Sequence, residues 1–174
     1  VTISYEAKNV IDGKEIGSSV VNPSSEDVSA ITGEAKGSLA VPATGFDFAG
    51  WYDASGALVC SDKHFTPSKP EGTRWLPVTY TAKFIKNLKI NGIDESTYYV
   101  DHDFTVSSYD EQHTVVEFVK DGKATPLNPI KETQLEAQAA VNADQPVVLK
   151  YKFPGNVKVD GAKINAYYNY EYIQ

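Results

Sequence analysis

Three histidines and one cysteine are the residues of this chain best suited to proton transfer, nucleophilic attack or metal binding. A hydrolase needs a nucleophile beside an oriented base, or two carboxylates in one cleft. His64, His102 and His113 lie in different predicted turns or strands, without the spacing of a nucleophile elbow or a zinc-binding helix. Cys60 cannot form an internal disulfide, and its place on a predicted strand indicates a buried, unreactive thiol. The chain is therefore predicted not to be an enzyme, and no cofactor is expected.

An acidic segment around His102 is the best candidate for a metal site. Asp101 and Asp103 would share one face of a strand, and Asp110 and Glu111 could add oxygen ligands. A site for a hard divalent cation needs several more ligands than this segment supplies. A solvated acidic face is the simpler interpretation, so no metal is predicted.

A strand acid suggests a covalent cross-link as another possibility. Glu117 shares a strand face with Val115 and Val119, where an unpaired buried carboxylate would be costly. In many pilin and adhesin domains a buried acid assists an intramolecular isopeptide bond between an early-strand Lys and a late-strand Asn. Lys89 and Asn169, or Lys89 and Asn165, have that order along the chain. The alternative is an ordinary exposed strand face.

An aromatic residue in a polar loop is the candidate binding residue. Trp75 lies in the segment E-G-T-R-W-L-P, directly after Arg74. If Trp75 is exposed, it and Arg74 would suit a sugar face or a partner protein. A core role for Trp75 is the competing prediction.

The first half of the chain reads as a compact unit of strands. The alternation of apolar and polar residues predicts strands over residues 1–7, 38–42 and 46–52 and a closing strand over 78–84. The Asp, Ser and Gly residues of 53–56 predict a hairpin turn. Residues 20–31 stay open between one helical turn and irregular strand. Trp51 and Tyr52 would face opposite sides of one strand, with Trp51 in the core.

The second half is also rich in strands, with one predicted helix. Strands are expected around 98–106, 114–119, 147–153, 157–159 and 164–173, and the helix over 130–141 after Asn128 and Pro129. Residues 85–87 are too short for a flexible linker. We therefore predict a mainly β or α+β chain of two small tandem modules, 1–86 and 87–174.

The composition excludes some partners. The net charge of −7 gives no positive field for nucleic acid or anionic lipid, and there is no apolar run long enough to span a membrane. The single cysteine and 41% hydrophobic content fit an ordered, β-rich protein without disulfides. This pattern is common among secreted proteins of Gram-positive bacteria.

The segment G-F-D-F-A-G-W-Y-D and the closing Y-T-A-K-F resemble the Listeria-Bacteroides repeat, or internalin-type B-repeat, of bacterial surface proteins. The similarity covers about residues 1–84, and it departs in the longer connection 63–77 and in Phe84, where many members carry tryptophan. It implies a β-grasp-like module that occurs as a repeat in adhesins and cell-wall proteins, and it implies no catalytic residues.

The expected function is thus a non-enzymatic stalk or repeat fragment of a Gram-positive cell-surface protein, part of an adhesin. Neighbouring repeats of the same chain would be its partners, and regions outside this sequence would export it and anchor it to the cell wall. The alternative is a module that binds a host glycan or matrix protein through Arg74 and Trp75. An accessory domain of an enzyme is a third option.

Overall fold

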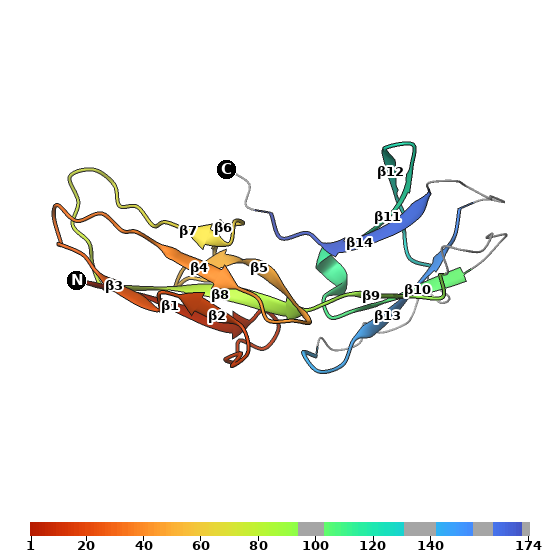
Figure 1. Cartoon of the computed structure of the whole chain (residues 1–174), viewed down its shortest axis with the longest axis horizontal. Helices are drawn as coiled ribbons and strands as arrows, with labels where there is room; N and C mark the ends of the chain where they lie inside the picture. Colours follow the sequence, from red (N-terminus) through yellow and green to blue (C-terminus); the bar gives the residue numbers. More distant parts are fainter. Residues whose placement is uncertain (94–102, 131–141, 155–161, 172–174) are drawn as a thin grey trace. The chain divides into compact units, whose positions relative to one another are not determined.

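The computed structural model describes residues 1–93, 103–130, 142–154 and 162–171 and shows a mainly β protein (Figure 1). The chain divides into two compact units. Unit 1 comprises Val1–Lys86 with Tyr170–Gln174, and unit 2 comprises Asn87–Asn169. The helix expected over 130–141 falls almost entirely outside the described residues. In the described part, the one helical element is the 3-10 turn η1 (Glu111–His113).

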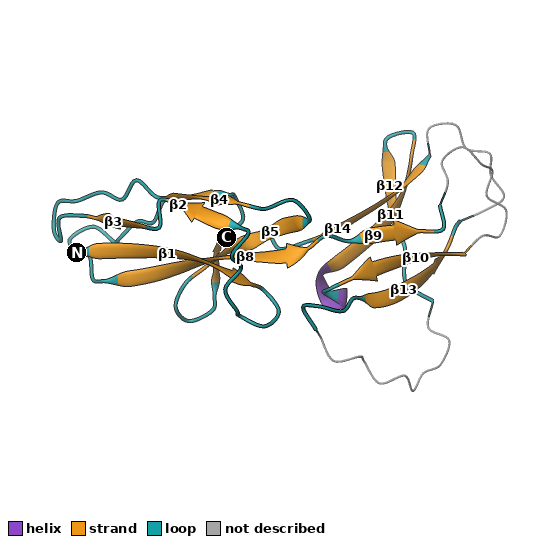
Figure 2. Cartoon of the chain, turned by 60° about the horizontal axis from the view of Figure 1, so that its bottom comes forward, coloured by secondary structure: helices purple, strands orange, loops and turns teal. Residues whose placement is uncertain are grey.

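Unit 1 is built on a mixed five-stranded sheet with the order β3-β1-β8-β5-β6. Figure 2 draws its long strands β1, β5 and β8 in orange. Its two central strands, β1 and β8, run parallel, and every other pairing is antiparallel. A small antiparallel sheet, β2-β4-β7, packs against it through Ala40 and Phe65. The strands are β1 (Thr2–Asn9), β2 (Val20–Asn22), β3 (Ser25–Asp27), β4 (Ser38–Val41), β5 (Phe46–Tyr52), β6 (Leu58–Cys60), β7 (His64–Phe65) and β8 (Val78–Lys86).

Alternation along the central strands creates the core of unit 1. Ile3 and Tyr5 of β1 and Ala82 and Phe84 of β8 are buried, because every second side chain of a strand faces the same side. Trp51 of β5 joins them with no exposed surface, and its indole N–H donates to Lys63 O at 2.9 Å. The predicted core role of Trp51 is confirmed.

A bulge in β5 makes room for this tryptophan. The register of β5 against β8 shifts between Phe48 and Trp51, and Gly50 within the shift has φ of +106°. A Cβ at Gly50 would lie 2.4 Å from Leu58 Cδ1, so Leu58 would have to move, and the positive φ strains any residue other than glycine. The bulge leaves Ala49 and Trp51 buried together.

The ambiguous stretch 20–31 contains two short strands, β2 and β3, and at its end a single turn closed by Gly33 N donating to Ser29 O at 2.9 Å. The strand β3 pairs with the beginning of β1, with Ile3 opposite Glu26. The strands β1, β4, β5 and β8 lie where alternation predicts them, within a few residues at their ends, whereas the short strand β7 was not predicted.

Unit 2 packs two three-stranded antiparallel sheets against each other, with the orders β13-β10-β9 and β12-β11-β14. Side chains from both sheets form one core around Phe104, Val116 and Tyr151. The strands are β9 (Lys89–Asn91), β10 (Asp103–Ser108), β11 (Thr114–Lys120), β12 (Lys123–Pro126), β13 (Val147–Lys152) and β14 (Lys163–Tyr168).

Four of these strands lie close to their predicted positions. The strand predicted from residue 98 is described only from Asp103 onwards, and the one predicted over 157–159 lies outside the described residues. The last strand ends at Tyr168, although alternation continues to residue 173. Alternation therefore overestimated the length of this strand.

Candidate functional site

Trp75 is buried, which corrects the exposure that the binding hypothesis requires. Only 6% of its surface is exposed, and its indole N–H donates to Gly33 O at 2.8 Å. Its backbone N–H donates to Ala30 O at 2.7 Å. Trp75 therefore attaches the long segment before β8 to the turn at 30–33. A tryptophan in a polar loop can be buried because its ring is large and apolar and its single N–H donor finds a partner, here Gly33 O.

The neighbours of Trp75 remain at the surface. Arg74 is exposed, and Leu76 is 66% exposed. Arg74 is thus accessible as predicted for a binding residue, but it lacks the exposed aromatic partner. The structure does not place Arg74 and the ring of Trp75 on one surface.

The residues of the hypothetical isopeptide bond lie apart. Lys89 is opposite Ser107 in the sheet β13-β10-β9, and both face away from the buried Val106 and Ser108. Glu117 faces outwards on β11, in the other sheet. The core of unit 2 therefore separates Lys89 from Glu117, since packed sheets lie about 10 Å apart. An isopeptide bond through Lys89 is incompatible with this arrangement.

Glu117 instead pairs across the strand with an asparagine. The side-chain nitrogen of Asn165 donates to Glu117 Oε1 at 3.0 Å, and the two residues are directly opposite in register. Asn169 lies four residues after Asn165, which is about 13 Å from it in an extended chain. The exposed strand face, which was the alternative for Glu117, is what the structure shows.

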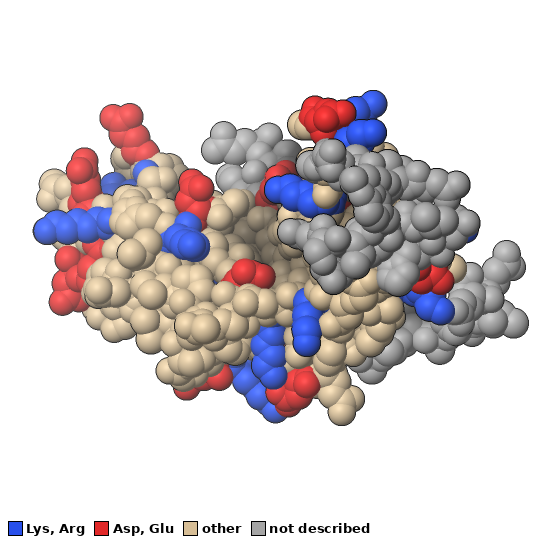
Figure 3. All heavy atoms as spheres, turned by 45° about the vertical axis from the view of Figure 1, so that its right-hand side comes forward, with Lys and Arg blue, Asp and Glu red and all other residues tan. Residues whose placement is uncertain are grey.

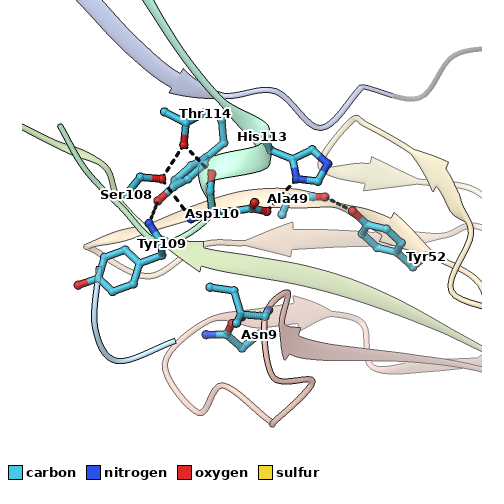
Figure 4. Close-up of polar contacts among 10 residues, drawn as sticks. Asn9, Ala49, Tyr52, Ser108, Tyr109, Asp110, His113 and Thr114 are labelled. Carbon is cyan, nitrogen blue, oxygen red and sulfur yellow. Dashed lines mark hydrogen bonds and ion pairs between the residues drawn. The ribbon is translucent and has the colours of Figure 1, made fainter. Parts of the chain in front are cut away.

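A polar network around η1 brings together Ser108, Asp110, His113 and Thr114 (Figure 4). His113 Nδ1 is 2.8 Å from Asp110 Oδ2, and the hydroxyls of Ser108 and Thr114 are 2.6 Å apart. Thr114 Oγ1 donates to Asp110 O, and the Asp110 backbone N–H donates to Ser108 Oγ at 3.1 Å. Ser108 has no exposed surface, so its hydroxyl cannot meet a substrate. These bonds hold the turn between β10 and β11.

A second network, in unit 1, was not predicted. The carboxylate of Glu26 accepts hydrogen bonds from Tyr5 Oη at 2.6 Å, Lys36 N at 2.8 Å and Gly37 N at 2.9 Å. Burial opposes ionisation of Glu26, but these hydrogen bonds outweigh it and lower its pKa below the usual 4.5. Burial, and then the hydrogen bond to Glu26, raise the pKa of Tyr5, which stays a neutral donor. No sequence motif marks this network, because its members are brought together by strand pairing.

Within the described residues, the predicted acidic metal-site candidates and Cys60 form no metal-binding or catalytic site. Asp101 and His102 lie outside them, and Asp103 is exposed. Within the described ranges no three His, Cys, Asp or Glu side chains are grouped to hold a metal ion. Cys60 is a free thiol of intermediate exposure, less buried than predicted. On the face drawn in Figure 3, acidic and basic side chains are interspersed.

The pairing of β1 with β8 joins the first and last strands of unit 1. The two strands are in parallel register over seven consecutive residue pairs, from Ile3 with Val78 to Asn9 with Phe84. Val10 N extends the contact by donating to Phe84 O at 2.9 Å. Val1, directly before β1, and Lys86, the last residue of β8, are at opposite ends of the same ladder. Tension between these points acts along the strands.

The fold and these sites define a mainly β chain of two units. No family model matches the chain, and no curated protein or solved structure is found to be similar to it. Among the described residues, no helix has the length and apolar character needed to cross a membrane.

Proposed function

We propose that the chain is a non-enzymatic stalk fragment of a bacterial cell-surface protein, in which unit 1 bears tension. The observation that carries this proposal is the seven-pair parallel register of β1 and β8. Tension from Val1 to Lys86 shears this ladder, so that its hydrogen bonds must break together. Each is worth only about 1 kcal/mol alone, but simultaneous rupture gives a high barrier to forced unfolding.

The assignment of unit 1 to a β-grasp-like repeat of Gram-positive surface proteins belongs to the same proposal. It is supported by the G-F-D-F-A-G-W-Y-D segment and by the adjacent, parallel first and last strands at the centre of the sheet. The small sheet β2-β4-β7 covers this sheet in place of a helix. Export, cell-wall anchoring and an adhesin context would come from other parts of the protein. A full-length sequence with neither export signal nor anchor would contradict them.

The test compares two directions of force on the same unit. In one arrangement, on a Cys60→Ser background, unit 1 is pulled from its N-terminus and from Asn87→Cys, directly after β8, which shears β1 against β8. In the other, on the same background, it is pulled from Lys14→Cys and Asn87→Cys. Lys14 O accepts from Asn9 N, so this handle lies at the far end of β1 and peels the ladder open from the end where β8 leaves.

Single-molecule force spectroscopy should show a markedly higher unfolding force for unit 1 in the shear direction. The peeling direction breaks one bond at a time and serves as the matched control, because the fold is unchanged. Equal forces in the two directions would refute the mechanical role.

Binding to a host glycan or matrix protein stays the second candidate function. Arg74 and Leu76 are exposed in the segment that Trp75 attaches to the core. Because Trp75 itself is buried, a glycan would have to be held without the aromatic platform first expected.

A further inference from the structure

One edge strand of unit 2 differs from the other three in how its free edge is protected. Natural proteins protect edge strands by keeping them short, by lysine or proline, or by covering them. Each of the four edge strands described for unit 2 carries a lysine, so only the other devices distinguish them. The strand β9 has three residues, β12 carries Pro126, and Lys150 O on β13 accepts from Ile130 N at 2.7 Å. The strand β14 has six residues and neither proline nor a register shift, and no strand of the described residues pairs with its other side.

The register with β11 shows which backbone groups of β14 point to the open side. Asn169 N donates to His113 O at 2.8 Å, so Asn169 and every second residue before it bond to β11. The N–H and C=O groups of Ile164 and Ala166 therefore point away from β11. The side chains of both residues pack on the core of unit 2, yet both remain partly exposed, as expected at an uncovered edge.

We propose that β14 pairs antiparallel with β14 of a second copy of this chain, joining the two sheets into one of six strands. The two-fold axis passes through Asn165, so that Ile164 lies opposite Ala166 of the second copy. These two pairs exchange four backbone hydrogen bonds, which satisfy the open groups. The contact is isologous, as closed dimers require.

The side chains on the outer face of β14 favour a second copy as the occupant. This face carries Lys163, Asn165 and the 40% exposed Tyr167. In the proposed register each Lys163 ammonium lies opposite a Tyr167 ring of the other copy, which is a favourable cation–π arrangement. Like charges do not meet, because the two Lys163 residues are at opposite ends of the contact. An edge that is complementary to itself requires no other partner.

The first experiment measures the mass of the full chain by sedimentation over a wide concentration range. A concentration-dependent dimer is expected. Ala166→Pro removes an N–H that is used twice in the dimer, and it should raise the dimer dissociation constant more than about tenfold while circular dichroism stays unchanged. A chain that is monomeric at every concentration, or a dimer that Ala166→Pro leaves intact, would overturn the proposal.

Charge variants test the same contact without proline. Tyr167→Lys places two lysines opposite each other and should weaken the dimer, and adding Lys163→Glu should restore it. The matched control is Val148→Lys, at a 63% exposed position on β13, which should leave the dimer unchanged. Failure of the double variant to restore association would refute the Lys163–Tyr167 pairing.

The register is tested by disulfide formation on a Cys60→Ser background in oxidised glutathione. At Asn165→Cys the two cysteines would be directly opposite in a non-hydrogen-bonded pair, about 4.5 Å between Cα atoms, which a disulfide can bridge. At Lys163→Cys they would be too far apart. Rapid cross-linking at 165 and none at 163 is expected, and the reverse result would overturn the register.

Discussion

At the scale of single residues, Glu26 makes the stability of unit 1 depend on pH. Its carboxylate connects β3 to β1 through Tyr5 and holds the backbone of Lys36 and Gly37. These bonds require the ionised acid, which is why they lower the pKa of Glu26. A group with a lowered pKa in the folded state stabilises the fold at pH values above its unfolded pKa. That stabilisation is lost as the pH falls through the lower, folded value.

We therefore expect Glu26→Gln to destabilise unit 1 at pH 7 and to change little at pH 3. The unfolding free energy of the wild-type chain should fall more steeply below about pH 4.5 than that of the variant, which no longer titrates there. Urea titrations from pH 3 to pH 7, followed by tryptophan fluorescence, measure this difference. Glu34→Gln, at an exposed position in the segment between β3 and β4, is the control and should follow the wild type. Parallel pH curves for Glu26→Gln and wild type would contradict the role given to Glu26.

At the scale of elements, the entry into β4 depends on a backbone that only glycine permits. Gly37 has φ of +88°, and a Cβ there would lie 2.1 Å from Phe65 O on β7. The same residue donates its N–H to Glu26. The small sheet β2-β4-β7 can thus pair β4 with β7 only if position 37 has no side chain.

Gly37→Ala and its control Gly45→Ala test whether a side chain at position 37 prevents β4 from pairing with β7. Gly45 has nearly the same φ, +89°, but a Cβ at that position would have nothing within 4 Å, so alanine there should cost only about 1–2 kcal/mol of conformational strain. Gly37→Ala should cost about 1–3 kcal/mol more, because β4 and β7 must also separate. Chemical denaturation of both variants measures the difference, and equal losses would show that the small sheet adapts without cost.

At the scale of the whole molecule, the two units have separate cores. One contains Trp51, Phe84 and Trp75, and the other contains Phe104, Val116 and Leu149. Both tryptophans of the chain are in unit 1, whereas strands of both units contribute to circular dichroism. The two signals therefore report on different parts of the protein.

Leu149→Ala should destabilise unit 2 by about 2–5 kcal/mol, because it removes a nearly buried side chain from the core. We expect the transition seen by circular dichroism to broaden or split while the tryptophan fluorescence transition stays in place. Val148→Ala, at the exposed neighbouring position, should change neither. A matching shift of the fluorescence transition in Leu149→Ala would show that the units unfold as one.

Much of the strand pattern was determined by the sequence itself. The alternation around Trp51, Phe84 and Leu149 depends only on the two-residue period of a strand, which is local. Trp75 was predictable only as one of two alternatives, because local polarity does not show what a loop covers. Its burial depends on Ala30 and Gly33, which lie more than forty residues away in the chain.

Pairing was decided only by the tertiary structure. Alternation predicts that β1, β8 and β14 are strands, but it contains no information about their neighbours, direction or register. The parallel ladder of β1 with β8, the separation of Lys89 from Glu117 and the open edge of β14 all follow from pairing. The physical reason is that strand hydrogen bonds join backbone groups, which are the same in nearly every residue, so partner choice depends on how the whole core packs.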